Sequence, residues 1–395
     1  MPREITLDEL PAGYSITAAR AGEQCEVQFR GFVSTEDGQK LITRLEGTPA
    51  HVLEKIAGLS ANSAAAATHS LLTIIRPDKT ATVYWNEFYP TIVARTKGAI
   101  EKGEVVTLDH ITDIERIRIP EAMIPHDAGL SYVFSFGWRK GYFFDYGPLL
   151  HGESRQARDY DLEVTLGHFL ARLLFQHRFS ISEEAWAEMF RQGWFPFSHL
   201  STDLIQSVIG HANAGFSIDE LLDRIATEVT TLIQSRLPEW RKNQILSPHV
   251  RFVETAFERY AAGDYISSNS ILYPRIEGVI RTYHSASFPE SSASQSELCK
   301  TASGHYSGIR EESLLLPRRF EKYLRDVYFA RFQPSAAAYS VSRNTISHGV
   351  VVAEKLDRKA ANVGFLILLQ LLSTAGASAI AVSERDNAQN KVETD

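Results

Sequence analysis

The sequence predicts an α+β protein in which a β-rich N-terminal domain is followed by helices and a C-terminal all-α bundle. In the first 157 residues, short runs of aromatic and β-branched residues alternate with turn-forming residues, as strands do. From Asp159 onward, leucines recur at helical spacing, and beyond Pro248 the pattern is wholly helical. We therefore expect a β-rich α+β domain over 1–157, a helical connecting region over 158–240, a bundle over 241–383 and a disordered tail over 384–395.

The clearest element of the N-terminal part is a hairpin, in which residues 132–138 and 142–146 flank Arg139-Lys140-Gly141. Its aromatic arms and basic tip could stack nucleic-acid bases, although an ordinary sheet with a solvated turn is the simpler interpretation. The other expected elements of this part are strands over 24–33, 71–75, 81–85, 104–107 and 114–119 and a short helix near 51–58.

Helices account for the rest of the chain. After the first, which starts near Asp159, we expect helices over 182–191, 201–210, 217–235, 249–262, 264–284, 311–330, 335–348 and 356–382. Ser217 and Glu220 form a capping-box pattern at the start of one of them. A serine-rich polar segment over 285–297 interrupts the bundle and predicts a loop.

The most apolar segment, Val363 to Val382, approaches the length needed to span a membrane. Gln370 and three hydroxyl residues interrupt it, and no aromatic belt flanks it. We therefore interpret it as a buried helix of the bundle and expect no membrane association.

Composition and charge restrict the class of protein. Cys25 and Cys299 have no metal or redox spacing, and the charged N-terminus has no apolar signal region, so we expect a cytoplasmic protein. The net charge is −7, but residues 241–360 carry 17 Lys and Arg against 12 Asp and Glu. The basic part of this acidic chain is compatible with a phosphate-bearing ligand.

The segment Ser342-Arg343-Asn344-Thr345-Ile346-Ser347-His348-Gly349 lies in this basic part, just before the apolar helix. A neighbouring Arg and His provide what RNA cleavage without a metal requires. Imidazole moves protons near neutral pH, and guanidinium stabilises the charge that develops on phosphate. Residues five apart on a helix point about 140° away from each other, so convergence depends on the long Arg side chain, a non-helical start or a second subunit.

The same spacing occurs at Arg172 and His177, so the interval alone has little specificity. That pair lies on a long amphipathic helix, which argues against catalysis. Only the later pair has an Asn after the Arg and a Gly after the His.

Five helices with an Arg-Asn-x-x-x-His-Gly segment before the last one resemble the HEPN superfamily of RNase toxins, defence proteins and nucleotide-binding modules. The segment from Leu272 to Arg281 is also similar to the second helix of several HEPN groups, so the resemblance covers about residues 249–383. It implies that Arg343 and His348 are the catalytic pair, that Asn344 orients one of them, and that Glu277 and Arg281 support them. It also implies a homodimer in which two such pairs face one another.

The expected function is that of a metal-independent endoribonuclease, a toxin or antiviral defence effector, which cleaves tRNA or mRNA to 2′,3′-cyclic phosphate and 5′-hydroxyl ends. It needs no cofactor, and the sequence offers no carboxylate cluster for a metal. The N-terminal domain is expected to bind a trigger or an inhibitory partner. Two alternatives remain: a non-catalytic nucleotide-binding, RNA-binding or protein-interaction module, and a structural role in which Arg343 pairs with a carboxylate such as Glu277 while His348 caps a helix.

Overall fold

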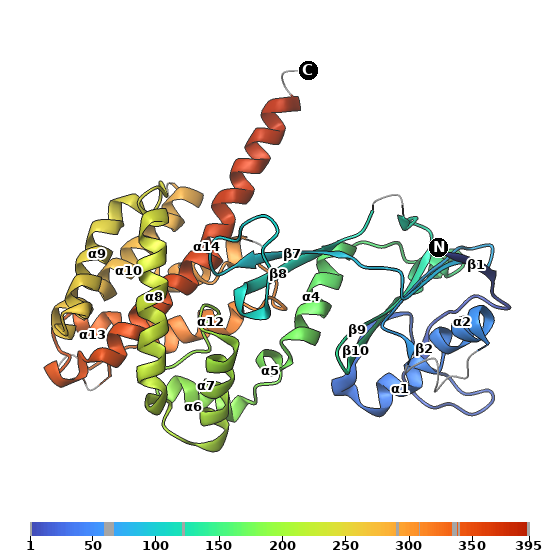
Figure 1. The fold of residues 1–395 in the computed structure, drawn as a ribbon, viewed down its shortest axis with the longest axis horizontal. Coiled ribbons are helices and arrows are strands. Elements are labelled where there is room, and N and C mark those ends of the chain that lie inside the picture. The colour runs from blue at the N-terminus through green and yellow to red at the C-terminus, as the bar shows by residue number, and fades with distance from the viewer. Residues whose placement is uncertain are drawn as a thin grey trace. The chain divides into compact units, whose positions relative to one another are not determined.

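The computed structural model describes residues 2–58, 67–120, 123–289, 292–307, 309–333, 338 and 340–392, with side chains to residue 375. The chain divides into two compact units (Figure 1). Unit 1 comprises residues 1–94 and 114–176, and unit 2 comprises residues 95–113 and 177–395. The predicted α+β class is confirmed, since unit 1 is built around a sheet and unit 2 around helices.

Unit 1 contains a six-stranded antiparallel sheet with the order β1-β6-β5-β9-β10-β4. Its strands are β1 (Arg3–Thr6), β4 (Arg30–Ser34), β5 (Ser70–Ile75), β6 (Thr80–Trp85), β9 (Gly129–Phe136) and β10 (Arg139–Asp145). Two further two-stranded sheets pair β2 (Tyr14–Ser15) with β3 (Val27–Gln28) and β7 (Thr91–Thr96) with β8 (Ile111–Arg118). The strand expected over 104–107 is wrong, because Val105 and Val106 are exposed in the connection between β7 and β8.

Alternating side chains of this sheet fill two apolar layers. Leu71 and Val133 lie in the layer that α1 (Gln39–Leu45) and α2 (Thr48–Ala57) cover. Leu72 and Tyr132 lie in the layer that α4 (Leu162–Leu174) covers. The leucines of α4 therefore complete the core of unit 1, which explains why this helix does not belong to a separate connecting region over 158–240.

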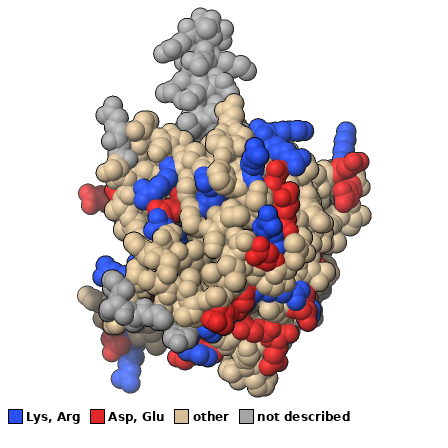
Figure 2. Space-filling model, turned by 90° about the vertical axis from the view of Figure 1, so that its left-hand side faces the viewer, with Lys and Arg blue, Asp and Glu red and all other residues tan. Residues whose placement is uncertain are grey.

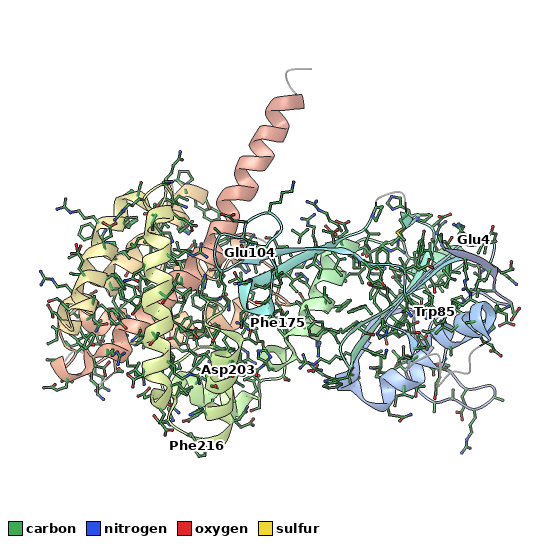
Figure 3. All side chains as sticks on the ribbon, viewed as in Figure 1. Glu4, Trp85, Glu104, Phe175, Asp203 and Phe216 are labelled. Atoms are coloured by element: carbon green, nitrogen blue, oxygen red, sulfur yellow. The ribbon has the colours of Figure 1, made fainter. Side chains whose placement is uncertain are left out.

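The predicted hairpin is confirmed, but its turn is Gly137-Trp138 and not Arg139-Lys140-Gly141, which pair with β9 as the first residues of β10. The two basic side chains are used inside unit 1. Arg139 donates hydrogen bonds to the carbonyl oxygens of Leu173 and Leu174, and Lys140 donates to that of Thr68. Trp85, at the end of β6, donates from its indole nitrogen to the Thr68 hydroxyl (Figure 3). These contacts favour the ordinary-sheet interpretation of the hairpin.

Unit 2 holds the remaining helices. They are α5 (Gln176–Phe179), which begins at the boundary, α6 (Glu183–Arg191), α7 (Thr202–Ala214), α8 (Leu222–Trp240), α9 (Ser247–Ala261), α10 (Tyr265–Ser287), α11 (Gln295–Ala302), α12 (Pro317–Tyr323), α13 (Arg343–Ser347) and α14 (Arg358–Val392). Short 3-10 turns include η6 (Ile218–Leu221), η7 (His305–Ser307) and η9 (Ala353–Lys355).

The apolar helix α14 is buried within unit 2, as expected for a bundle helix. Phe365 to Leu369 are almost fully buried, and the α10 residues Leu272 and Ile276 belong to the same apolar core. Gln370 accepts hydrogen bonds from the amide and hydroxyl of Ser198 and donates to the Leu315 carbonyl oxygen, so its amide is fully used in the interior. Among the described residues, no helix has the length and hydropathy that crossing a membrane requires.

Several helix boundaries differ from the prediction. The helix expected over 217–235 begins as the 3-10 turn η6 and continues as α8 to Trp240, and Ser217 makes no side-chain cap hydrogen bond. The helix expected over 311–330 comprises α12 and a π-helical turn, η8 (Leu324–Tyr328). Of the helix expected over 335–348, the described residues show only α13. Residues 334–337 and 339 lie outside the described part of the chain. The helix α14 continues to Val392, where a disordered tail was expected from residue 384.

Candidate functional site

The predicted site residues Arg343 and Asn344 begin a helix little longer than one turn. Ser342 is the N-cap of α13, and a reciprocal capping box joins its hydroxyl and backbone to Thr345. Gly349, with φ of +68°, adopts the left-handed conformation that ends a helix. The residue types at both ends therefore limit α13 to the span between Ser342 and His348.

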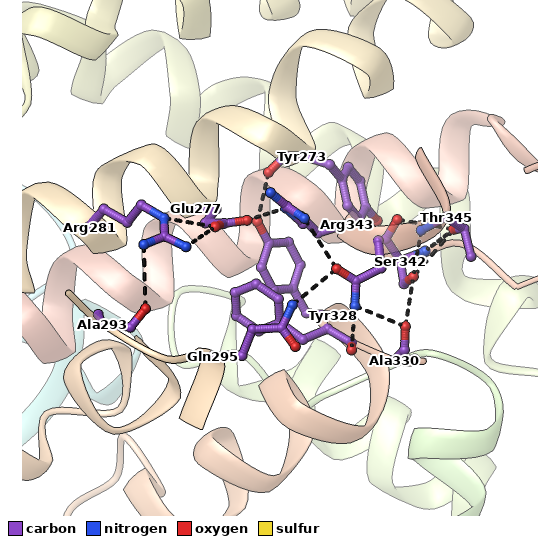
Figure 4. A network of polar contacts seen from close by, with 12 residues as sticks. Tyr273, Glu277, Arg281, Ala293, Gln295, Tyr328, Ala330, Ser342, Arg343 and Thr345 are labelled. Carbon is purple, nitrogen blue, oxygen red and sulfur yellow. Dashed lines mark hydrogen bonds and ion pairs between the residues drawn. The ribbon is translucent and has the colours of Figure 1, made fainter. Parts of the chain in front are cut away.

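The guanidinium of Arg343 is anchored by a buried carboxylate. Its Nε forms an ion pair with Glu277 Oε2 on α10, and its Nη1 donates to Asn344 Oδ1 at 3.2 Å (Figure 4). The Arg343 side chain is 25% exposed and the Glu277 side chain only 5%. Arg343 Nη2 has no hydrogen-bond partner among the described residues, so this edge of the guanidinium can receive a further acceptor.

The other oxygen of Glu277 binds the second predicted supporting residue. Oε1 accepts from Nε of Arg281 at 2.8 Å and lies 2.7 Å from its Nη2, one helical turn along α10. The structure thus brings Glu277, Arg281 and Arg343 together. Two cations compensate one buried carboxylate, which is the condition for burying such a charge without a large penalty.

Asn344 ties the start of α13 to the chain that precedes it. Its amide nitrogen donates to the carbonyl oxygens of Phe329 at 2.9 Å and Ala330 at 3.3 Å. Its amide oxygen accepts from both Arg343 and Gln295. The side chain is buried and has partners for both polar atoms, so it fixes the position of the Arg343 guanidinium.

His348 is exposed at the C-terminal end of α13 and is separate from this network. Its backbone amide donates to the Asn344 carbonyl oxygen, and its ring lies 5.1 Å from the Phe332 ring, centroid to centroid. No hydrogen bond joins its imidazole to Arg343 or to any other described residue. Within one chain, the predicted pair is therefore held by one short helix but not brought into contact.

Two supporting groups were missed from the sequence. Gln295 falls in the segment predicted as a polar loop, but Ser294 and Glu297 cap α11 there and place Gln295 beside Asn344. The spacing of Ser294 and Glu297 is a capping-box signal that could have revealed this helix. Tyr328 lies next to the ion pair. Its burial and, to a smaller extent, the negative charge of Glu277 raise the pKa of its hydroxyl group well above the ordinary value.

Arg172 and His177, which have the same spacing in the sequence, lie in a different environment. Arg172 lies on the exposed face of α4 in unit 1, 3.7 Å from Glu36 Oε2. His177 belongs to unit 2 and lies near Gln206. The two residues of this pair therefore belong to different units, whereas Arg343 and His348 lie on one short helix.

Surface charge is mixed on the face shown in Figure 2, where Lys and Arg side chains lie between Asp and Glu side chains. Within the described part of the chain, no three His, Cys, Asp or Glu residues are grouped so that they could hold a metal ion. Comparison with protein-family models, curated proteins and solved structures finds no match for this chain.

Proposed function

We propose that unit 2 is a HEPN-like module and that Arg343 and His348 cleave RNA without a metal ion. The observation that carries this proposal is the anchored Arg343, which Glu277 and Asn344 hold by two of its nitrogens while Nη2 is left for a phosphate oxygen. A guanidinium fixed in advance stabilises developing negative charge without a reorganisation cost.

In this mechanism His348 accepts the proton of a ribose 2′-hydroxyl as that oxygen attacks the adjacent phosphorus. The bond from phosphorus to the 5′-oxygen breaks, and that oxygen takes the proton that His348 has accepted and leaves as a 5′-hydroxyl, so the imidazole is neutral again. The other product carries a 2′,3′-cyclic phosphate. Because His348 does not contact Arg343 in one chain, we propose that two copies associate and that the pair acts across the dimer.

The test is RNA cleavage by purified full-length protein in EDTA, with total RNA and tRNA as substrates. His348→Ala should slow cleavage by about 100-fold or more, the usual contribution of a general acid–base group. The matched control is His305→Ala, which changes another exposed histidine of unit 2. Equal rates for wild type and His348→Ala would exclude the proposed role.

A second function is favoured by one specific observation. Arg343 uses two nitrogens to neutralise or orient groups of its own chain, which is also what a structural arginine does. The module would then bind RNA, a nucleotide or a protein without hydrolysis. Saturable RNA binding by fluorescence anisotropy, with intact RNA after prolonged incubation, would favour this function over cleavage.

The role of unit 1 belongs to the same proposal. We propose that it binds a trigger or an inhibitory partner of a toxin or defence effector, acting in the cytoplasm on tRNA or mRNA. The test is to add a candidate partner to the purified protein in the cleavage assay above and to measure whether the rate of RNA cleavage changes.

A further inference from the structure

Unit 2 contains a cavity of about 650 Å³ that borders the Arg343 network at Tyr328 and Ala330 but is not lined by Arg343 or His348. This volume is within the range of small-molecule sites. The cavity is lined by the C-terminal end of α6, the segment 215–219 after α7, the middle of α10, the end of α12, the π-helical turn η8, the segment 355–357 and the first three turns of α14. All of these elements belong to unit 2.

Three tyrosines form the buried part of the cavity lining. Tyr273, Tyr323 and Tyr328 are each almost fully buried, so their rings present little surface to a ligand. Their hydroxyl groups donate to the carbonyl oxygens of Ala360, Gly193 and Tyr273, respectively.

The apolar surface of the lining comes from side chains that are partly exposed. Phe190, Val327 and Val341 are half-buried and line the cavity. A ligand can therefore make apolar contacts with these three side chains.

The π-helical turn is an independent sign of a binding site. Three of its five residues, Asp326, Val327 and Tyr328, line the cavity. Single π-helical turns are rare and occur frequently at functional sites, since they redirect side chains at the cost of poorer backbone hydrogen bonding.

The charged side chains that line the cavity carry equal numbers of positive and negative charges. The cations are Arg191, Lys355 and Lys359, and the carboxylates are Asp219, Asp326 and Asp357. Four of these six already form ion pairs: Lys359 with Asp219, Arg191 with Glu188, and Asp326 with both Lys322 and Arg325.

The two remaining charges lie two residues apart before α14. Lys355 forms no ion pair with any residue that the structure describes. Asp357 Oδ1 accepts from the Ala360 amide as the N-cap of α14, and Oδ2 has no partner in the described chain. One cation and one carboxylate oxygen in the cavity lining thus have no partner in the described chain.

We infer that this cavity binds a zwitterionic small molecule, an amino acid with a large apolar or aromatic side chain. Its carboxylate would pair with Lys355, its ammonium group with Asp357, and its side chain would lie against Phe190, Val327 and Val341. A phosphate ester fits less well, because it would meet as many carboxylates as cations. This inference does not depend on RNA cleavage.

The test is isothermal titration calorimetry of the full-length protein with leucine, phenylalanine and tryptophan. Saturable binding of at least one is expected. Phenethylamine lacks the carboxylate and N-acetylphenylalanine lacks the ammonium group, so each should bind at least tenfold more weakly than phenylalanine. Failure of all three amino acids to bind at millimolar concentration, or binding of AMP in their place, would overturn the inference.

Three variants locate the site. Lys355→Met and Asp357→Asn should each weaken binding at least tenfold, and the Asn keeps the helix cap. Val363→Phe should abolish binding by filling the cavity, provided its circular dichroism spectrum matches wild type. The control Lys242→Met removes another exposed lysine of unit 2 and should bind normally. Unchanged binding in Lys355→Met, which is a surface substitution, would contradict the assignment even if Val363→Phe does not fold.

Discussion

At the scale of single residues, Glu277 is the group on which the Arg343 network depends. It is the buried member of two ion pairs, while Arg281 is half exposed. Glu277→Gln would leave the Arg343 guanidinium largely buried beside a neutral group. We expect a loss of about 2–4 kcal/mol in the free energy of unfolding, measured by urea denaturation.

Arg281→Gln is the matched control for that substitution, because it removes only the exposed cation. Its cost should be within about 1 kcal/mol, as for other solvent-screened ion pairs. Equal losses for the two variants would show that the buried carboxylate does not hold Arg343 in the way described.

His199 makes the stability of unit 2 depend on pH. Burial, reinforced by the Arg236, Lys97 and Arg178 cations, lowers the pKa of its imidazole to about 3. The unfolded chain, with an ordinary histidine pKa of 6.5, binds this proton first as pH falls. The stabilising contribution is therefore complete above pH 6.5 and is lost as pH falls toward 3.

We expect the unfolding free energy of His199→Gln to fall less than that of wild type between pH 6.5 and 4. Urea denaturation at a series of pH values measures this difference, and carboxylates common to both proteins cancel. His305→Gln, at an exposed position, should follow the wild-type slope. Parallel curves for wild type and His199→Gln would refute the assignment.

At the scale of elements, the N-cap of α13 links stability to the proposed activity. Ser342→Ala removes the side-chain acceptor for the Thr345 amide and should cost about 1 kcal/mol. Because this short helix carries both Arg343 and His348, RNA cleavage should fall by more than the stability loss explains.

Ser182→Ala provides the comparison, since Ser182 caps α6 through the Ala185 amide. It should cost a similar free energy and leave the cleavage rate unchanged. Similar cleavage rates for the two cap variants would show that α13 geometry is unimportant for activity.

Local patterns were sufficient for much of the fold. The β9–β10 hairpin and the capped helices follow from short-range propensity and turn chemistry, and buried α14 follows from its continuous apolar character. The sheet order could not be predicted, because β5 pairs with β9, and β10 with β4, although the strands of each pair are distant in sequence. The π-helical turn η8 has no periodic signature and was assigned to an ordinary helix.

The candidate site shows the same limit. Arg343, Asn344 and His348 were found from their types and order, Glu277 and Arg281 were implied by the family resemblance, and the ion pair to Glu277 was weighed as an alternative. Whether that carboxylate reaches Arg343 depends on how α10 and α13 pack, and no local pattern encodes this. Arg343 begins α13 and His348 is its C-cap, so the helical turn between them directs the two side chains apart, as expected for residues five apart on a helix.

At the scale of the whole molecule, residues 95–113 belong to the helical unit although they lie within the sheet-forming part of the sequence. Asp113 is buried and accepts from the Ser313 hydroxyl at 2.7 Å and the Leu314 amide at 2.9 Å. Asp113→Ala should destabilise unit 2 by about 2 kcal/mol, because a buried amide loses its acceptor.

Hydrogen exchange resolved by mass spectrometry would measure this effect, with faster exchange expected in the helices of unit 2. Asp127→Ala, at an exposed position of unit 1, should leave those rates unchanged. Unaltered exchange in Asp113→Ala would mean that the segment 95–113 does not stabilise the helical unit.

The proposed dimer makes its own prediction. If Arg343 of one copy acts with His348 of the other, mixing inactive Arg343→Ala with inactive His348→Ala should restore part of the RNA cleavage. Each variant alone, at the same total concentration, is the control. A mixture as inactive as its components would exclude a site shared between copies.

The most direct test of the central claim is analysis of the ends that wild-type protein leaves on RNA in EDTA. Mass spectrometry should detect 2′,3′-cyclic phosphate and 5′-hydroxyl ends, and a substrate with a single 2′-deoxy residue at the cleaved position should remain intact. Cleavage of that substrate, or products with 3′-hydroxyl ends, would contradict the assigned roles of His348 and Arg343.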